Sequence, residues 1–218
     1  PDPHQADLER SLDPAPQVKA DRQPGREAPT ADALSGKHVA MLFEKASLRT
    51  WTTFEIAVRE LGGNIVALQP DVGLGTREAV ADIALSLERW VDAAVVRTYS
   101  HRQLEQFALS APKLHVINAL SDDEHPCQAL ADFLTLREHW GELRGRTVAY
   151  LGDGNNVASS LAQAAAALGV HFHVASPDGY TLTNTVVQRA TNAARYGARL
   201  TLFTEAADAV AGVDAIYT

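Results

Sequence analysis

Short apolar runs alternate with longer segments of helical periodicity from residue 38 to the end of the chain, and this alternation constrains the fold most. Runs of four to six residues rich in Val, Ile, Leu and Ala are typical of buried strands. Strands that alternate with helices form parallel sheets with helices on both faces. We therefore predict an α/β protein. The predicted strands are 38–43, 64–68, 93–97, 114–118, 147–151, 171–175, 199–203 and 214–217. The predicted helices lie around 54–61, 80–90, 102–108, 126–140, 156–168, 185–196 and 206–210.

The alternation restarts after residues 141–146, which separate the long predicted helix 126–140 from the next strand. We therefore predict two doubly wound parallel-sheet domains, at 35–141 and 142–218. The second domain has four predicted strands and no helix after the last one. We expect this domain to be incomplete and the chain to be truncated at its C-terminal end.

Residues 1–34 are predicted to form a proline-rich N-terminal arm. Six of the ten prolines lie there, at positions 1, 3, 14, 16, 24 and 29. Pro14 and Pro16 interrupt a short helical pattern at 8–12, because proline has no amide N–H to donate and clashes with the preceding turn.

Composition excludes several classes of function. The formal net charge of −8 argues against general nucleic-acid binding. No apolar run approaches the roughly 18–20 residues that cross a bilayer, so we predict no membrane association. The single cysteine, Cys127, rules out a disulfide within the chain and is typical of a cytoplasmic protein. The eight histidines show no paired spacing of metal ligands, and we predict neither a metal site nor a cofactor.

The segment 43–50 forms a polar turn between the first predicted strand and a helix. Ser47 and Thr50 carry hydroxyls that can cap the helix start. Unpaired backbone N–H groups and the positive end of the helix dipole favour an anion at such a turn, and Arg49 adds a fork of donors. An ordinary helix cap with a solvated arginine is the alternative interpretation of this turn alone.

Polar side chains follow two further strands of the same predicted sheet. Arg97 ends one strand, and His125 and Gln128 come soon after the next one. Ligands of open α/β sheets bind at the carboxyl ends of the strands. Arginine matches phosphate oxygens, and a histidine beside an amide can hold a polar acyl group and stabilise an oxyanion. Taken singly, each of these residues also has an ordinary structural interpretation.

Two other features suggest different chemistry. Cys127 lies at a helix start, where a thiol can become a nucleophile, although a small buried residue is the commoner role. Gly152 and Gly154 supply the start of a dinucleotide-binding fingerprint, but Val157 stands where the third glycine belongs. A nicotinamide-dependent oxidoreductase is therefore the weaker alternative. Asn155 and Asn156 are better placed to offer amides to a polar substrate.

Four segments, in this order, resemble motifs of the aspartate/ornithine carbamoyltransferase family. The first three resemble its S-x-R-T, R-T-(F/Y)-S-H and H-P-x-Q motifs, and the fourth points to ornithine rather than aspartate as acceptor. They are Ser47-Leu48-Arg49-Thr50, Arg97-Thr98-Tyr99-Ser100-His101, His125-Pro126-Cys127-Gln128 and Gly152-Asp153-Gly154-Asn155-Asn156.

The resemblance implies transfer of a carbamoyl group from carbamoyl phosphate to the δ-amine of L-ornithine, giving citrulline and phosphate, as in arginine biosynthesis. Ser47, the Leu48 backbone, Arg49 and Thr50 would then hold the phosphate. The family also implies a homotrimer or a multiple of it, and no metal or organic cofactor. The remaining implied roles are bridging of phosphate and carbonyl by Arg97, polarisation of the carbonyl by His125, binding of the carbamoyl amine by Gln128, and ornithine binding by Asn156.

The sequence departs from the family pattern at two positions near the implied phosphate site. Trp51 stands where a second arginine usually follows S-x-R-T, and Gly73 stands in a loop where many relatives have glutamine. These departures and the end of the chain at Thr218 keep a second hypothesis open. The protein would then be a truncated, catalytically impaired homologue that still binds carbamoyl phosphate.

Overall fold

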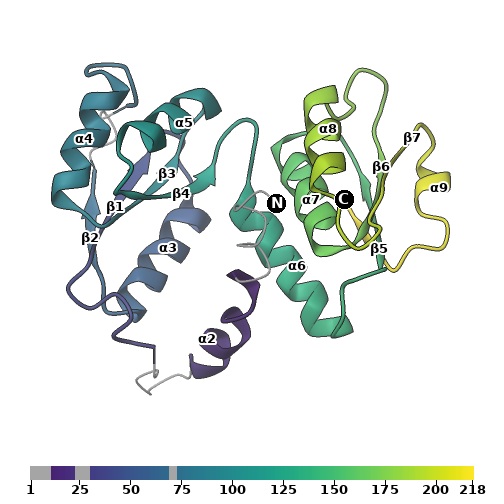
Figure 1. Ribbon diagram of the computed structural model, residues 1–218, viewed down its shortest axis with the longest axis horizontal. Coiled ribbons are helices and arrows are strands. Elements are labelled where there is room, and N and C mark those ends of the chain that lie inside the picture. Colours follow the sequence, from purple (N-terminus) through teal and green to yellow (C-terminus); the bar gives the residue numbers. More distant parts are fainter. Residues whose placement is uncertain (1–10, 23–29, 69–72) are drawn as a thin grey trace. The chain divides into compact units, whose positions relative to one another are not determined.

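The computed structural model describes residues 11–22, 30–68 and 73–218. It contains two four-stranded sheets in which every strand pair is parallel, so the predicted α/β fold with two parallel sheets is confirmed (Figure 1). The chain divides into two compact units. The N-terminal unit comprises Pro16–Asp123, and the C-terminal unit comprises Glu124–Thr218 together with the short stretch that ends at Ala15.

The N-terminal unit is built on a sheet with the strand order β2-β1-β3-β4. Alternate residues of β1 face opposite sides of this sheet, as the pleat requires. Ala40 and Leu42 pack among residues of α4 and α5, whereas Val39 and Met41 pack with Val58 of α3. The elements in order are α2 (Ala15–Asp21), β1 (His38–Phe43), α3 (Leu48–Glu60), β2 (Asn64–Ala67), α4 (Val80–Trp90), β3 (Ala93–Arg97), α5 (His101–Ser110) and β4 (His115–Leu120).

The C-terminal unit has the strand order β7-β6-β5-β8. Its core is one cluster in which residues of α6, α7 and α8 pack with β5 and β6, and Phe133 and Phe172 are among the largest fully buried side chains. Small alanines allow α7 to be buried along most of its length. The elements in order are α6 (Pro126–Trp140), β5 (Thr147–Leu151), α7 (Asn156–Leu168), β6 (His171–Ala175), α8 (Asn184–Ala193), β7 (Leu200–Phe203), α9 (Ala206–Ala209) and β8 (Ala215–Tyr217).

An aspartate fixes the start of the central strand in each unit. In the N-terminal unit, the backbone N–H of His38 donates to Asp92 Oδ2 at 2.9 Å, and Lys37 Nζ lies 2.8 Å from Asp92 Oδ1. In the C-terminal unit, the N–H of Thr147 donates to Asp214 Oδ2 at 2.8 Å, and Arg146 Nη1 lies 2.8 Å from Asp214 Oδ1. We call these two arrangements the aspartate anchors.

Most predicted elements are present with shifted ends. Helix α8 ends at Ala193, three residues before the predicted end, because the chain turns through Tyr196, whose φ is +53°, and Gly197, whose φ is +80°. Strand β4 continues to Leu120 because a register shift between Val96 and Arg97 lets β3 pair with it further along.

The predicted interruption is present at Pro14, which precedes α2, but Pro16 lies in the first turn of α2, where the missing N–H of proline has no intrahelical acceptor to lose. Most of the helical pattern predicted at 8–12 lies outside the described residues. Helix α6 belongs to the C-terminal unit, whereas the sequence-based boundary follows it at 141/142. The division into an arm and two domains stays a prediction. Within the described residues, no helix is both long and apolar enough to cross a membrane.

Candidate functional site

The turn after β1 has the predicted form of strand, polar turn and helix. Ser47 is the N-cap of α3, and its Oγ accepts a hydrogen bond from the Thr50 backbone N–H at 3.3 Å. The Ser47 hydroxyl also lies 3.0 Å from Thr50 Oγ1. Leu48 and Arg49 form the first turn of α3, where backbone N–H groups have no intrahelical acceptor, and both side chains are exposed. The turn therefore presents hydroxyls, amides and one exposed guanidinium.

Arg97 reaches this turn from the neighbouring strand. In the parallel pairing of β1 with β3, Arg97 lies opposite Phe43, the last residue of β1. Its Nη1 donates to Thr50 Oγ1 at 3.3 Å, and its Nε is buried without a hydrogen-bond partner among the described residues. None of the ion pairs among the described residues involves Arg97, and burial lowers the pKa of its guanidinium. A part-buried cation without a counter-charge favours an anionic ligand.

Glu44 organises the same region, although no sequence motif indicated a role for it. Its carboxylate accepts a hydrogen bond from the Leu74 backbone N–H at 2.5 Å and another from the buried Thr98 hydroxyl. It thereby ties the loop after residue 72 and the end of β3 to the end of β1. Its position directly after a buried strand, inside the polar turn, was the only sequence signal that could have identified it.

The rest of the segment 97–101 is structural in the N-terminal unit. Ser100 caps α5 by accepting from the Gln103 N–H, and His101 Nδ1 lies 2.8 Å from Ser121 Oγ. Within this segment, Arg97 is the residue whose side chain donates a hydrogen bond to Thr50.

The two departures from the family pattern have different surroundings. Trp51 packs edge-on against Phe43, with ring centroids 5.0 Å apart, and its Nε1 donates to Glu55 at 3.0 Å. This position therefore brings no positive charge to the turn. Gly73 is close to Glu44, because a Cβ on it would lie 3.2 Å from Glu44 Oε1. Val72, the preceding loop residue, lies outside the described residues.

His125 and Gln128 belong to the C-terminal unit, at the start of α6. His125 is the N-cap residue, and Pro126 occupies the first turn as predicted. The backbone N–H of His125 donates to Ser160 Oγ of α7 at 2.9 Å. Gln128, one turn further on, donates through Nε2 to Asp132 Oδ1 at 2.9 Å.

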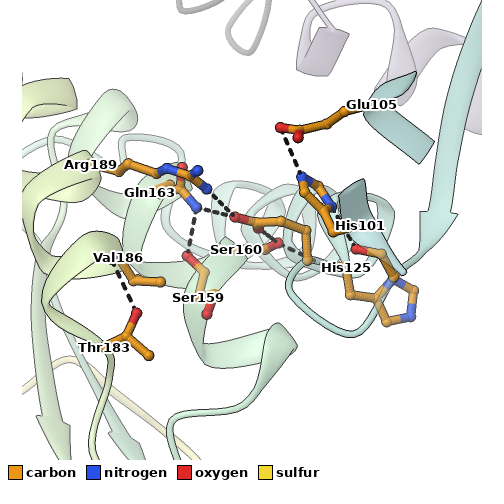
Figure 2. A network of polar contacts seen from close by, with 11 residues as sticks. His101, Glu105, His125, Ser159, Ser160, Gln163, Thr183, Val186 and Arg189 are labelled. Carbon is orange, nitrogen blue, oxygen red and sulfur yellow. Dashed lines mark hydrogen bonds and ion pairs between the residues drawn. The ribbon is translucent and has the colours of Figure 1, made fainter. Parts of the chain in front are cut away.

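A polar network behind His125 fixes the start of α6 (Figure 2). The Ser160 hydroxyl donates to Glu124 Oε2, and Gln163 Nε2 donates to Glu124 Oε1 at 2.5 Å. Arg189 of α8 lies 4.0 Å from the same carboxylate, whose side chain is only 13% exposed. The sequence did not indicate this network, since its members come from three separate segments.

The segment 152–156 forms the turn between β5 and α7. Asn155 is the N-cap of α7: its Oδ1 accepts from the Val157 and Ala158 N–H groups, and its Nδ2 donates to Asp153. The amide of Asn155 is thus used within the turn, which leaves Asn156, the first residue of α7, as the better candidate to contact a substrate. Its half-buried position is compatible with that role.

Gly154 is required by a close backbone contact. A Cβ on this residue would lie 2.5 Å from the Leu182 backbone nitrogen and 2.6 Å from the Thr181 carbonyl carbon. Its own N–H donates to the Tyr180 carbonyl at 2.6 Å. The glycine that suggested a dinucleotide fingerprint is therefore explained by packing of the loop before α8.

The nucleophile alternative for Cys127 receives no support. Burial raises the pKa of Cys127 to about 11, which disfavours the reactive thiolate. Across residues 11–22, 30–68 and 73–218, no group of three or more His, Cys, Asp or Glu side chains could hold a metal ion.

The structure thus brings Ser47, Thr50 and Arg97 together, with Arg49 on the same turn. His125, Gln128 and Asn156 lie at helix starts of the C-terminal unit, which is described by itself. The individual binding and catalytic roles predicted for these residues stay predictions.

Comparison with known proteins identifies the class. Residues 2–138 match the family model described as the aspartate/ornithine carbamoyltransferase carbamoyl-P binding domain. Residues 144–218 match the corresponding Asp/Orn binding domain. The chain therefore belongs to the aspartate/ornithine carbamoyltransferase family, and the resemblance seen in the sequence is confirmed.

The similar proteins are named ornithine carbamoyltransferase. The one from Shewanella oneidensis is 50% identical over 188 residues, covering 85% of this chain and 62% of its own length. The one from Parafrankia sp. is 46% identical over 209 residues, covering 95% of this chain and 65% of its own length. The chain thus spans less than two thirds of the length of these relatives.

Solved structures of ornithine carbamoyltransferases are also similar. The Pyrococcus furiosus enzyme matches with a TM-score of 0.91 and 41% identity, covering 98% of this chain and 68% of that one. The Thermus thermophilus enzyme matches with a TM-score of 0.85 and 42% identity, covering 98% and 70%.

Proposed function

We propose that the protein binds carbamoyl phosphate and transfers its carbamoyl group to the δ-amine of L-ornithine, giving citrulline and phosphate. The observation that carries this proposal is the Arg97 guanidinium, which is part-buried, has no carboxylate partner among the residues that the structure describes, and is hydrogen-bonded to a hydroxyl at a helix start. Membership of the carbamoyltransferase family and the names of the relatives support the choice of substrates.

The phosphate would be held at the Ser47 turn. In this proposal Ser47 and Thr50 donate hydroxyl hydrogen bonds, Leu48 donates its backbone N–H, and Arg49 supplies a flexible guanidinium. The dipole of α3 adds positive potential at the same point. Arg97 then bridges a phosphate oxygen and the carbonyl oxygen, for which its unpaired Nε and second Nη offer donors.

The carbamoyl group and ornithine would be bound by residues of the C-terminal unit. His125 polarises the carbonyl oxygen, Gln128 holds the carbamoyl amine, and Asn156 binds ornithine. The lone pair of the δ-amine attacks the carbonyl carbon to form a tetrahedral intermediate. The bond from that carbon to the phosphate oxygen then breaks, the attacking nitrogen loses a proton, and phosphate departs. Orientation and charge stabilisation supply the catalysis.

The test is calorimetric binding of carbamoyl phosphate together with a citrulline assay. Arg97→Met is expected to weaken carbamoyl phosphate binding about 10- to 100-fold, because a charge-assisted hydrogen bond contributes about 1.5–3 kcal/mol. Arg102→Met removes an exposed guanidinium of the same unit and serves as the matched control. Equal affinities for the two variants would contradict the proposal.

A second candidate function is carbamoyl phosphate binding without turnover. It is favoured by Trp51, which brings an indole bonded to Glu55 where relatives usually carry an arginine. Trp51→Arg is expected to raise carbamoyl phosphate affinity if the missing charge limits binding. Binding without citrulline formation would favour this candidate, whereas tight NADH binding would contradict both.

We further propose that the protein is cytoplasmic and forms a homotrimer, on the strength of the family resemblance and the single free cysteine. Sedimentation equilibrium is expected to give three times the chain mass of 23.4 kDa, or a multiple of that value. A monomer at micromolar concentration would contradict the oligomer proposal.

A further inference from the structure

Asp132 lies one helical turn after Gln128 on α6 and accepts its side-chain amide. Gln128 Nε2 donates to Asp132 Oδ1 at 2.9 Å, the spacing of four residues placing both side chains on one face of the helix. Asp132 Oδ2 is buried and has no hydrogen-bond partner among the described residues. Burial raises the pKa of this carboxyl.

The buried Asp132 carboxyl does not stabilise the fold in an obvious way. A buried polar atom without a partner costs about 1–3 kcal/mol, which an apolar leucine at this position would avoid. Gln128 donates its side-chain amide to Asp132, and it is also the residue that the proposed function assigns to the carbamoyl amine. We therefore look for the role of the Gln128–Asp132 pair in ligand recognition.

The chemistry of the two groups fixes the direction of the amide. An ionised carboxylate only accepts hydrogen bonds, whereas a glutamine amide donates from one end and accepts at the other. Asp132 therefore holds the NH₂ end of Gln128, and the carbonyl Oε1 must point away from the carboxylate. A carbonyl oxygen presented in this way can accept from an N–H donor of a ligand and cannot donate to it.

The carboxylate is backed by the sheet of the same unit. The Tyr217 hydroxyl of β8 faces Asp132, and burial together with this carboxylate raises the pKa of Tyr217 to about 12. Tyr217 stacks on Tyr150 with ring centroids 5.7 Å apart, and the Tyr150 hydroxyl donates to the Asp153 carbonyl at 2.9 Å. These contacts restrict movement of the carboxylate away from α6.

We propose that Asp132 is a positioning residue that directs Gln128 Oε1 toward the amino group of the carbamoyl moiety, and so selects carbamoyl over acetyl phosphate. The inference rests on the proposed function, because it takes Gln128 to contact the carbamoyl group. Asp132 itself does not touch the ligand. Its contribution is to exclude the flipped amide, which would place an NH₂ against the NH₂ of the ligand.

Asp132→Asn tests this mechanism with almost no change of shape. An asparagine can donate as well as accept, so Gln128 is free to flip. We expect carbamoyl phosphate to bind about 10-fold more weakly, the effect of one lost hydrogen bond of about 1.4 kcal/mol. Acetyl phosphate and inorganic phosphate are expected to bind the variant and the parent protein equally. The matched control is Glu138→Gln, which neutralises an exposed carboxylate on the same helix.

A double-mutant cycle separates positioning from general damage. If Asp132 acts through Gln128, then Asp132→Asn has no further effect on affinity once Gln128→Ala is present. Independent, additive losses would overturn the inference, as would an Asp132→Asn variant that keeps the full preference for carbamoyl over acetyl phosphate. A parent protein that binds phosphate but not carbamoyl phosphate would instead refute the proposed function, and the inference with it.

Discussion

Replacing Ser160 by alanine removes the hydroxyl that links α7 to the start of α6. Ser160 Oγ accepts from the His125 backbone N–H at 2.9 Å and donates to the Glu124 carboxylate (Figure 2). Both bonds are part-buried. The substitution therefore leaves a backbone donor and a charged acceptor each with one partner fewer.

The magnitude follows from these two bonds. A neutral hydrogen bond contributes about 1 kcal/mol and one to a charged group about 1.5–3 kcal/mol, so Ser160→Ala is expected to lower the free energy of unfolding by about 2–4 kcal/mol. Gln163 and Arg189 still contact the Glu124 carboxylate, which keeps the effect toward the lower end. Alanine also gains roughly 0.5 kcal/mol of helix propensity.

Ser159 provides the matched control. It is the preceding residue of α7 and, like Ser160, is 5% exposed, but no bond of its hydroxyl is found among the described residues. Ser159→Ala gains the same helix propensity, so the difference between the two variants isolates the network. Urea unfolding followed by circular dichroism measures both. Equal midpoints for Ser159→Ala and Ser160→Ala would refute the reasoning that the network stabilises the start of α6.

Three further predictions concern other parts of the molecule. Cys127, whose pKa burial raises to about 11, is expected to react with iodoacetamide at pH 8 roughly 100-fold more slowly in the folded than in the urea-unfolded protein, and similar rates would contradict its burial. Asp214 has a pKa lowered first by the Thr147 N–H, so its stabilising contribution is present above the unfolded pKa of about 4 and lost as pH falls through the folded value. The gap in urea midpoint between the parent and Asp214→Asn should therefore shrink from pH 7 to pH 3, and a constant gap would show that the anchor does not depend on charge. Gly154→Ala places a methyl group against the Thr181 backbone and is expected to destabilise the fold by about 1–3 kcal/mol in thermal unfolding, whereas an unchanged Tm would show that this loop moves freely.

Local sequence patterns were sufficient to predict most helices and strands and the part of the candidate site that lies in the N-terminal unit. Ser47 was identifiable as a helix cap because capping depends on residues within one turn, and Arg97 because strand ends follow from apolar runs. Glu44 was not identifiable, since its partner Leu74 lies 30 residues away in the sequence. The link from His125 to Ser160 likewise spans 35 residues and exists only after α6 and α7 have packed. Helical spacing alone could have paired Gln128 with Asp132, but only the burial of the carboxylate shows why the pair matters.

The aspartate anchors help to set the register of the paired strands in each parallel sheet. Asp92 not only accepts from His38 but also donates its own N–H to the His38 carbonyl at 2.9 Å, and Asp214 does the same with Thr147 at 2.8 Å. Sliding either strand by one residue would break both backbone bonds and the ion pair together, and would turn every apolar side chain to the wrong face. Each aspartate anchor thus joins two distant segments, 54 residues apart in the N-terminal unit and 67 residues apart in the C-terminal unit, and disfavours misaligned strands during folding. Both aspartate anchors lie at the amino ends of the strands. Residues at the carboxyl ends can therefore change with substrate preference while the alignment of the strands is preserved.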